Sequence, residues 1–145
     1  MADTPLAGDK VTADLLNGAI SDVFGDFLGS HNVATSQTTT STSYTDLATI
    51  GPTVTITSKG TKALVIWACT QSTTSGSCAS SPAVSGSTTA AAADSHGTVG
   101  SDAGRTAIGW AFFTITPGSN TYTVKYRVTG GTGTFLDRRM MVWAP

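Results

Sequence analysis

The chain lacks features that several large classes of protein need. It contains no glutamate, and charged residues make up only 12% of its 145 positions, roughly half of the share in an ordinary soluble domain. The formal net charge is −1, so no strong field is available to hold nucleic acid or an anionic membrane surface. The longest apolar run, Ala63 to Cys69, is about a third of a membrane span. We therefore expect no nucleic-acid partner and no membrane partner.

Cysteines are also scarce, and no targeting signal is visible. Residues 1–5 lack the basic and apolar regions of a secretory signal, and a chain made in the cytosol normally keeps its thiols reduced. The two cysteines, Cys69 and Cys78, flank a polar loop that could bring them together. A disulfide and two free thiols at the ends of neighbouring strands therefore both stay open.

Threonine and serine are unusually frequent in this chain, whereas charged residues are rare. The chain has 27 threonines and 16 serines, about three residues in ten, which disfavours long helices because threonine is stiff at χ1 and serine competes for backbone hydrogen bonds. Threonine suits a pleated, half-buried surface instead. The composition predicts a mostly β protein.

Residues 1–30 differ from everything that follows them. Thr12 is a good helix N-cap and Gly18 a stop signal, which together predict one short helix. The apolar residues after it recur at roughly helical spacing but are interrupted by glycines, so they need a partner surface, either the β domain or another chain. We predict an N-terminal anchor segment with a short helix over 1–30. The candidate shell-anchoring residues are Val11, Leu15, Leu16, Val23, Phe24, Phe27 and Leu28.

Strand signals recur over residues 31–145. Residues 53–57 and 121–128 alternate between apolar and polar side chains, and 63–70 is a continuous apolar run, which predicts a central strand with both faces covered. Residues 97–104 are expected to form a loop. About seven short strands, separated by glycine and proline turns with no helices between them, predict an antiparallel, jelly-roll-like β-sandwich over 31–145.

Two stretches carry a resemblance to a known group of proteins. Residues 38–56 (TTTSTSYTDLATIGPTVTI) and 116–139 (from TPGSNTYTVKYRV to RR) resemble the small β-sandwich domain in virion proteins of tailed phages that infect actinobacteria. Residues 7–17 are similar to the lead-in segment before such domains in phage tail and head-fibre proteins. The resemblance implies a homotrimer, located in the virion, assembled in the host cytoplasm and exposed on the particle exterior.

No constellation of residues predicts chemistry. Asp94, Ser95 and His96 are adjacent, which prevents triad geometry, and no Gly-x-Ser-x-Gly motif is present. With two histidines, a protein-only metal site would need distant cysteines or aspartates. We therefore expect no enzymatic activity, no catalytic residues, no cofactor and no metal. The basic residues Lys125, Arg127, Arg138 and Arg139 are candidates for a small basic patch.

Two functions from different classes follow. The first is a capsid decoration or head-fibre protein, which binds the major capsid protein through the anchor segment and displays a trimeric β-sandwich. The alternative is a minor tail or tail-fibre domain, associated with tail or baseplate proteins, which recognises host cell-wall glycan through loops such as 72–77 and 96–104. The aromatic residues either fill one sandwich core or partly serve contacts between chains.

Overall fold

The computed structural model describes residues 28–100 and 104–145. In this part of the chain, strands are the dominant elements, and the single helical element is the short 3-10 helix η1 (Asp94–His96). The strands are β1 (Leu28–Val33), β2 (Gln37–Thr39), β3 (Thr53–Ser58), β4 (Lys62–Thr73), β5 (Cys78–Gly86), β6 (Thr98–Gly100), β7 (Arg105–Thr114), β8 (Gly118–Val128) and β9 (Gly133–Trp143).

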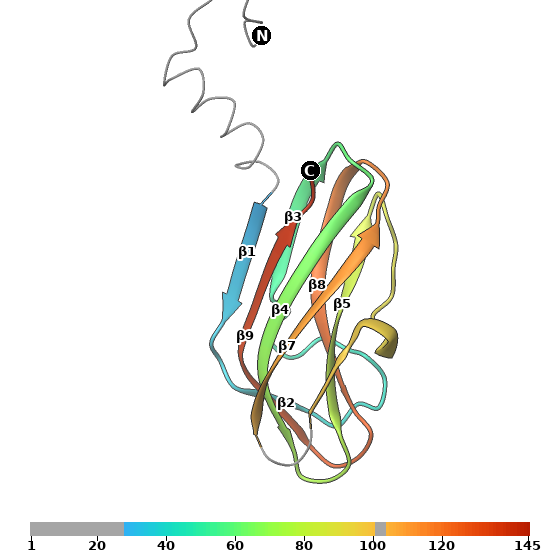
Figure 1. Ribbon diagram of the computed structural model, residues 1–145. Coiled ribbons are helices and arrows are strands. Elements are labelled where there is room, and N and C mark those ends of the chain that lie inside the picture. Colours follow the sequence, from blue (N-terminus) through green and yellow to red (C-terminus); the bar gives the residue numbers. More distant parts are fainter. Residues whose placement is uncertain (1–27, 101–103) are drawn as a thin grey trace, which may run out of the picture.

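The strands form two sheets that pack face to face (Figure 1). The first sheet has the order β1-β9-β4-β7, with β2 also paired to β9, and the second has the order β3-β8-β5-β6. The pairs are antiparallel and nested: β5 with β6, β4 with β7, β3 with β8, and β1 with β9. This nesting defines a jelly roll, in which a long antiparallel ribbon is rolled into two sheets. The predicted β-sandwich is confirmed.

Strict alternation builds the core between the sheets. On β8, Tyr122, Val124, Tyr126 and Val128 all point inward and are at most 1% exposed, as the sequence pattern predicts. On β4 the inward residues include Trp67, whose indole Nε1 donates a hydrogen bond to Ser80 Oγ on β5 at 3.2 Å. That bond joins the two sheets at the centre of the core and satisfies the one polar group of the indole.

Two boundaries differ from the sequence prediction. The sandwich begins at Leu28 instead of residue 31, because residues 28–33 pair with β9 from Trp143 to Arg138. The predicted loop 97–104 contains β6, which pairs with residues 78–80. A three-residue strand is too short to show an alternating pattern, so backbone pairing decides it. The predicted short helix falls in residues 1–27, outside the described residues.

A β-bulge in β9 sends a charged side chain into the core. Ala68 pairs with Arg139 but Thr70 pairs with Leu136, so one residue of β4 faces two of β9. Asp137 takes the positive φ (49°) that the bulge requires. The alternation therefore shifts by one residue, and Arg138 points inward with no exposed surface. Arg138 is thus not part of the basic patch that the sequence suggested.

Two buried tyrosines on β8 allow a matched prediction. Tyr126 donates a hydrogen bond to the carbonyl of Gly51 at 3.1 Å, whereas the hydroxyl of Tyr122 is buried with no hydrogen-bond partner among the described residues. We expect Tyr126→Phe to lower the free energy of unfolding by about 1 kcal/mol and Tyr122→Phe to leave it unchanged or raise it by a similar amount. Urea unfolding measures both, and equal losses in the two variants would contradict this account.

Cys69 and Cys78 are free and buried. Burial raises the pKa of the Cys69 thiol to about 12, and it raises the pKa of Tyr122 to about 12 as well. In an unfolded chain these groups ionise near about 8.5 and 10. The folded protein therefore holds more protons than the unfolded chain between those values and about 12.

This difference predicts an alkaline loss of stability. Because the unfolded state binds fewer protons in that window, the free energy of unfolding falls as pH rises from about 9 toward 12. The stabilising contribution of these two groups is fully present below about pH 8. Urea unfolding at stepped pH measures the slope. Cys69→Ala should make the decline shallower, and a flat profile in the parent protein would show that these groups titrate as freely when folded as when unfolded.

Candidate functional site: an apolar face on the first sheet

The outward side of the first sheet carries large exposed apolar side chains. On the edge strand β7, Ile108, Trp110 and Phe112 are exposed by 70%, 66% and 67%, and the rings of Trp110 and Phe112 meet edge to face with centroids 5.9 Å apart. The neighbouring strands continue the surface. We call the following set the apolar face: Leu28, Leu64, Ile66, Ile108, Trp110, Phe112, Met141 and Trp143.

Strand register arranges the apolar face in rows. Leu28 pairs with Trp143 across β1 and β9, and Leu64 pairs with both Trp143 and Phe112. In the next row, Ile66 lies between Met141 and Trp110. Paired residues on one side of a sheet have their Cβ atoms about 5 Å apart, so the rows form one continuous surface across four strands.

The exposed side of the first sheet bears on two expectations from the sequence, which concern the strand at residues 63–70 and the aromatic residues. The apolar run 63–70 predicts a strand covered on both sides, yet only the side with Val65 and Trp67 is buried, and Leu64 and Ile66 are half-buried on the other. The aromatic residues are likewise divided, with Trp110, Phe112 and Trp143 outside the core. Within the described residues, nothing covers the outward side of the first sheet.

Crowding inside the sandwich explains why β7 turns Ile108, Trp110 and Phe112 outward. The inward positions of β7 include Ala107, Gly109 and Ala111. A Cβ placed on Gly109 would lie 2.6 Å from Cε2 of Trp67 and 2.7 Å from Cγ2 of Thr98, which real Cβ atoms do not tolerate. Trp67 already fills that space, so only small residues fit at the inward positions beside it, whereas Phe113, farther along β7, points into the core.

Polar contacts close the apolar face at both ends. At one end, Lys62 Nζ donates a hydrogen bond to Thr114 Oγ1 at 2.7 Å, and at the other the hydroxyls of Thr70 and Thr106 lie 2.8 Å apart. An open depression at this second end is lined in part by Asp137 and Arg139. The surface therefore has an apolar centre and a polar rim of both charge signs, which is the anatomy of a protein interface.

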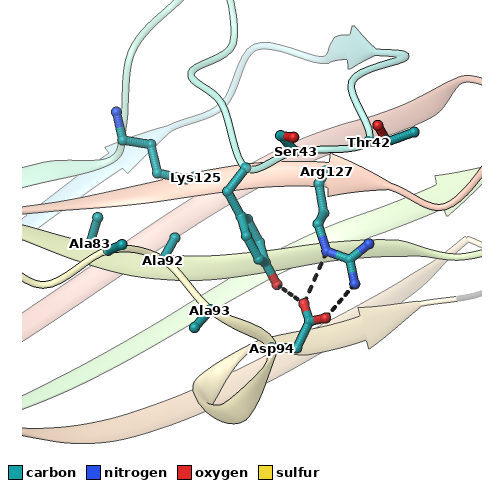
Figure 2. Close-up of a pocket in the computed structure, with 10 residues that line it drawn as sticks. Thr42, Ser43, Ala83, Ala92, Ala93, Asp94, Lys125 and Arg127 are labelled. Carbon is teal, nitrogen blue, oxygen red and sulfur yellow. Dashed lines mark hydrogen bonds and ion pairs between the residues drawn. The ribbon is translucent and has the colours of Figure 1, made fainter.

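A second feature is an open depression of about 680 Å³ on the second sheet, shown in Figure 2. Segment 42–44 borders one side, residues 91–94 border another, and Ala83, Lys125 and Arg127 line it from β5 and β8. Arg127 approaches Asp94 through two nitrogens, with Nε 3.0 Å from Oδ1 and Nη2 2.6 Å from Oδ2.

The charged groups of this depression already have partners. The Arg127 guanidinium, and next the Tyr44 hydroxyl at 2.8 Å, hold the pKa of Asp94 below its usual value. Burial raises the pKa of Tyr44 to about 12, and Arg127 lies 5.4 Å from the centre of the Tyr44 ring. Lys125 pairs with Asp46 at 2.6 Å. The network fixes the surface segments on the sheet.

The other sequence candidates are placed as follows. The anchor residue Leu28 begins β1, is 51% exposed and lies beside Trp143 on the apolar face. The remaining six, Val11, Leu15, Leu16, Val23, Phe24 and Phe27, lie outside the described residues. The sequence left open whether Trp110 and Phe112 fill the core or serve contacts between chains, and it did not single out Ile108. The alternation of small and bulky apolar residues from Ala107 to Phe112 indicates two faces of a strand but not which of them is inward.

The serine and histidine residues considered above as candidates for catalysis or metal binding make structural contacts. Ser95 Oγ lies 3.3 Å from His96 Nδ1, and the His96 ring packs edge-on against Phe113 with centroids 5.2 Å apart. His31 Nδ1 accepts a hydrogen bond from the Thr53 backbone at 2.8 Å. Among residues 28–100 and 104–145, no cluster of three or more His, Cys, Asp or Glu could hold a metal ion. No helix in this same part of the chain is long and apolar enough to cross a membrane.

Fold and surface thus define a jelly-roll protein with an apolar sheet face. No protein-family model matches the chain, and no curated protein matches its sequence. The chain is similar to several solved structures, two of which follow. The CBM22-1 xylan-binding domain of Xyn10C from Paenibacillus barcinonensis is 11% identical, with a TM-score of 0.48, covering 81% of this chain and 83% of that one.

The second structure is the enzymatically active domain of tailspike protein 4 from bacteriophage CBA120. It is 14% identical, with a TM-score of 0.37, and the match covers 83% of this chain but only 20% of the tailspike chain. The xylan binding and the enzymatic activity in these descriptions belong to those two proteins.

Proposed function

We propose that this chain is a structural accessory protein of a tailed-phage virion, of the capsid decoration or head-fibre type. It binds the major capsid protein through residues 1–30 and displays a homotrimeric jelly roll on the particle exterior. The observation that carries the proposal is the position of Leu28. This anchor residue is exposed at the start of the first strand, so the anchor segment joins the domain at its surface.

The jelly roll fits a display role because charged side chains of its second sheet pair with charged side chains of the surface segments. The ion pairs of Arg127 with Asp94 and Lys125 with Asp46 hold surface segments onto the second sheet. Two motifs that carry the phage resemblance form tight connections, with residues 115–117 between β7 and β8 and residues 129–132 between β8 and β9. These features make the jelly roll rigid, and the anchor segment provides the attachment.

Attachment of this kind acts by binding energy alone. Burying apolar side chains of the anchor segment at a junction between shell subunits contributes about 25 cal/mol for each Å² removed from water. A protein that binds only the assembled shell stabilises the shell by mass action.

The decisive experiment compares attachment of full-length variants to particles that lack the protein. Phe24→Asp combined with Phe27→Asp should weaken attachment about tenfold or more, because two buried aromatic contacts are lost. Asn17→Asp combined with Ser21→Asp, which adds the same two charges at polar positions of the same segment, should attach like the parent. Equal attachment of the double variant and the parent would overturn the proposal.

A tail location is the second candidate, and the depression beside Arg127 is the observation that favours it. Its volume of about 680 Å³ and its Tyr44 ring suit one polar unit of a cell-wall glycan. Mass spectrometry of purified particles separates the two locations, since hundreds of copies indicate the capsid and a handful indicates the tail. Binding of the isolated protein to host cell wall, lost in Arg127→Ala, would support the tail function.

A further inference from the structure

We propose that the apolar face of the first sheet is the surface through which copies of this chain associate with one another. The assignment deepens the homotrimer of the proposed function but does not depend on the virion location. It rests on four observations, which concern the size of the face, its composition, its rim and the packing behind it.

The exposed area is large for a surface that faces water. With ordinary side-chain areas, the exposed parts of the apolar face amount to roughly 600 Å², the upper end of what a monomeric protein presents as one patch. A standard protein interface buries about 800 Å² on each partner. The apolar centre with its polar rim therefore matches one side of such an interface.

Composition favours a protein partner over a glycan or a lipid surface. The centre combines Trp110, Phe112 and Trp143 with Ile66, Ile108 and Met141, and aromatic residues and methionine are enriched in interface centres. Branched aliphatic side chains between the rings offer sugars no hydrogen bonds. A lipid surface would be expected to bring a basic fringe, but this rim carries Asp137 as well as Arg139.

The mixed rim and neutral centre make the face self-complementary. A copy packed on it meets no like-charge cluster in the centre, and the rim can pair Arg139 of one copy with Asp137 of the next. A two-fold pair brings the same patch of two copies together, and a cyclic trimer brings neighbouring parts of the face together on successive copies.

Packing behind the face shows that its residues are not displaced core residues. Gly109 leaves no room for a larger side chain beside Trp67, so Trp110 and its neighbours cannot exchange places with the inward residues by a one-residue slip of β7. Their exposure is fixed by the fold, and association of copies removes it from water.

Sedimentation velocity of the isolated full-length protein, over a wide range of concentrations, tests the assignment. We expect the parent to sediment as a multiple of its 14.7 kDa chain mass. Trp110→Lys should weaken self-association roughly thirtyfold or more, as for a central interface residue. Val99→Lys is the matched control, since Val99 is 64% exposed on the second sheet, and it should associate like the parent.

Phe112→Lys provides a second variant on the same face, and far-UV circular dichroism confirms that each variant is folded. If the parent protein is monomeric, acrylamide quenching of its tryptophans shows whether another part of the chain covers the apolar face. A monomeric parent with shielded tryptophans would indicate that its own residues 1–27 cover the face, and a monomer with accessible tryptophans would leave the face bare. Either result, or an undisturbed oligomer in both lysine variants, overturns the assignment. Particle attachment is measured separately, so failure here leaves the virion function standing.

Discussion

Arg138→Met is expected to lower the free energy of unfolding by about 3–5 kcal/mol. The guanidinium is fully buried. Its Nη1 donates to the carbonyls of Thr49 and Gly51 at 3.1 and 3.0 Å, and its Nη2 donates to Gln37 Oε1 at 3.0 Å. Methionine fills a similar volume but removes these three charge-assisted hydrogen bonds, each worth about 1.5–3 kcal/mol. The Thr49 carbonyl loses its donor, whereas the Gly51 carbonyl keeps the Tyr126 hydroxyl and Gln37 Oε1 keeps the backbone N–H of Thr49.

The role of Arg138 is to tie the loop after β2 to the core. Among the described residues no carboxylate pairs with it, so its charge is compensated by carbonyl groups and by the Tyr126 ring, whose centre is 5.5 Å away. Arg105→Met is the matched control, because Arg105 is exposed at the start of β7 and its loss should stay within about 0.5 kcal/mol. Arg138→Lys keeps the charge but loses the forked donor, and an intermediate loss is expected.

Urea unfolding at one fixed protein concentration measures these variants, since association changes apparent stability. A loss in Arg138→Met no larger than in Arg105→Met would show that the loop carbonyls are satisfied without the guanidinium.

Gly109→Ala is expected to lower the free energy of unfolding by about 2 kcal/mol. The added methyl group would press on the Trp67 indole, which its hydrogen bond to Ser80 holds in place, and overpacking a close-packed core typically costs about 1–3 kcal/mol. The near-ultraviolet circular dichroism of the tryptophans should change at the same time, because the indole must move.

Gly104→Ala is the control for this substitution. A Cβ at Gly104 would lie 3.7 Å from Cβ of Ser72, an ordinary van der Waals contact, so its effect should stay within about 0.5 kcal/mol. Similar stabilities for the two alanine variants would mean that the space beside Trp67 is larger than the structure indicates.

Local sequence patterns determined much of the fold. Alternation along 121–128 identified β8 and its inward side, and the same reasoning placed Val54 and Ile56 of β3 in the core. Proline and glycine turns marked the connections on either side of β8. These features were readable because each depends on neighbours a few residues apart, through side-chain period and turn chemistry.

The candidate site was only partly readable for a physical reason. Along β7, apolar residues occupy both alternating sets, so the pattern from Ile108 to Phe113 does not say which set is inward. Trp67, more than forty positions earlier in the chain, decides this by filling the space opposite Gly109. In the same way, only the pairing of β9 with β4 reveals the bulge that buries Arg138. The sequence by itself determined a β-sandwich with an apolar leading segment, whereas long-range packing decided which apolar side chains face water.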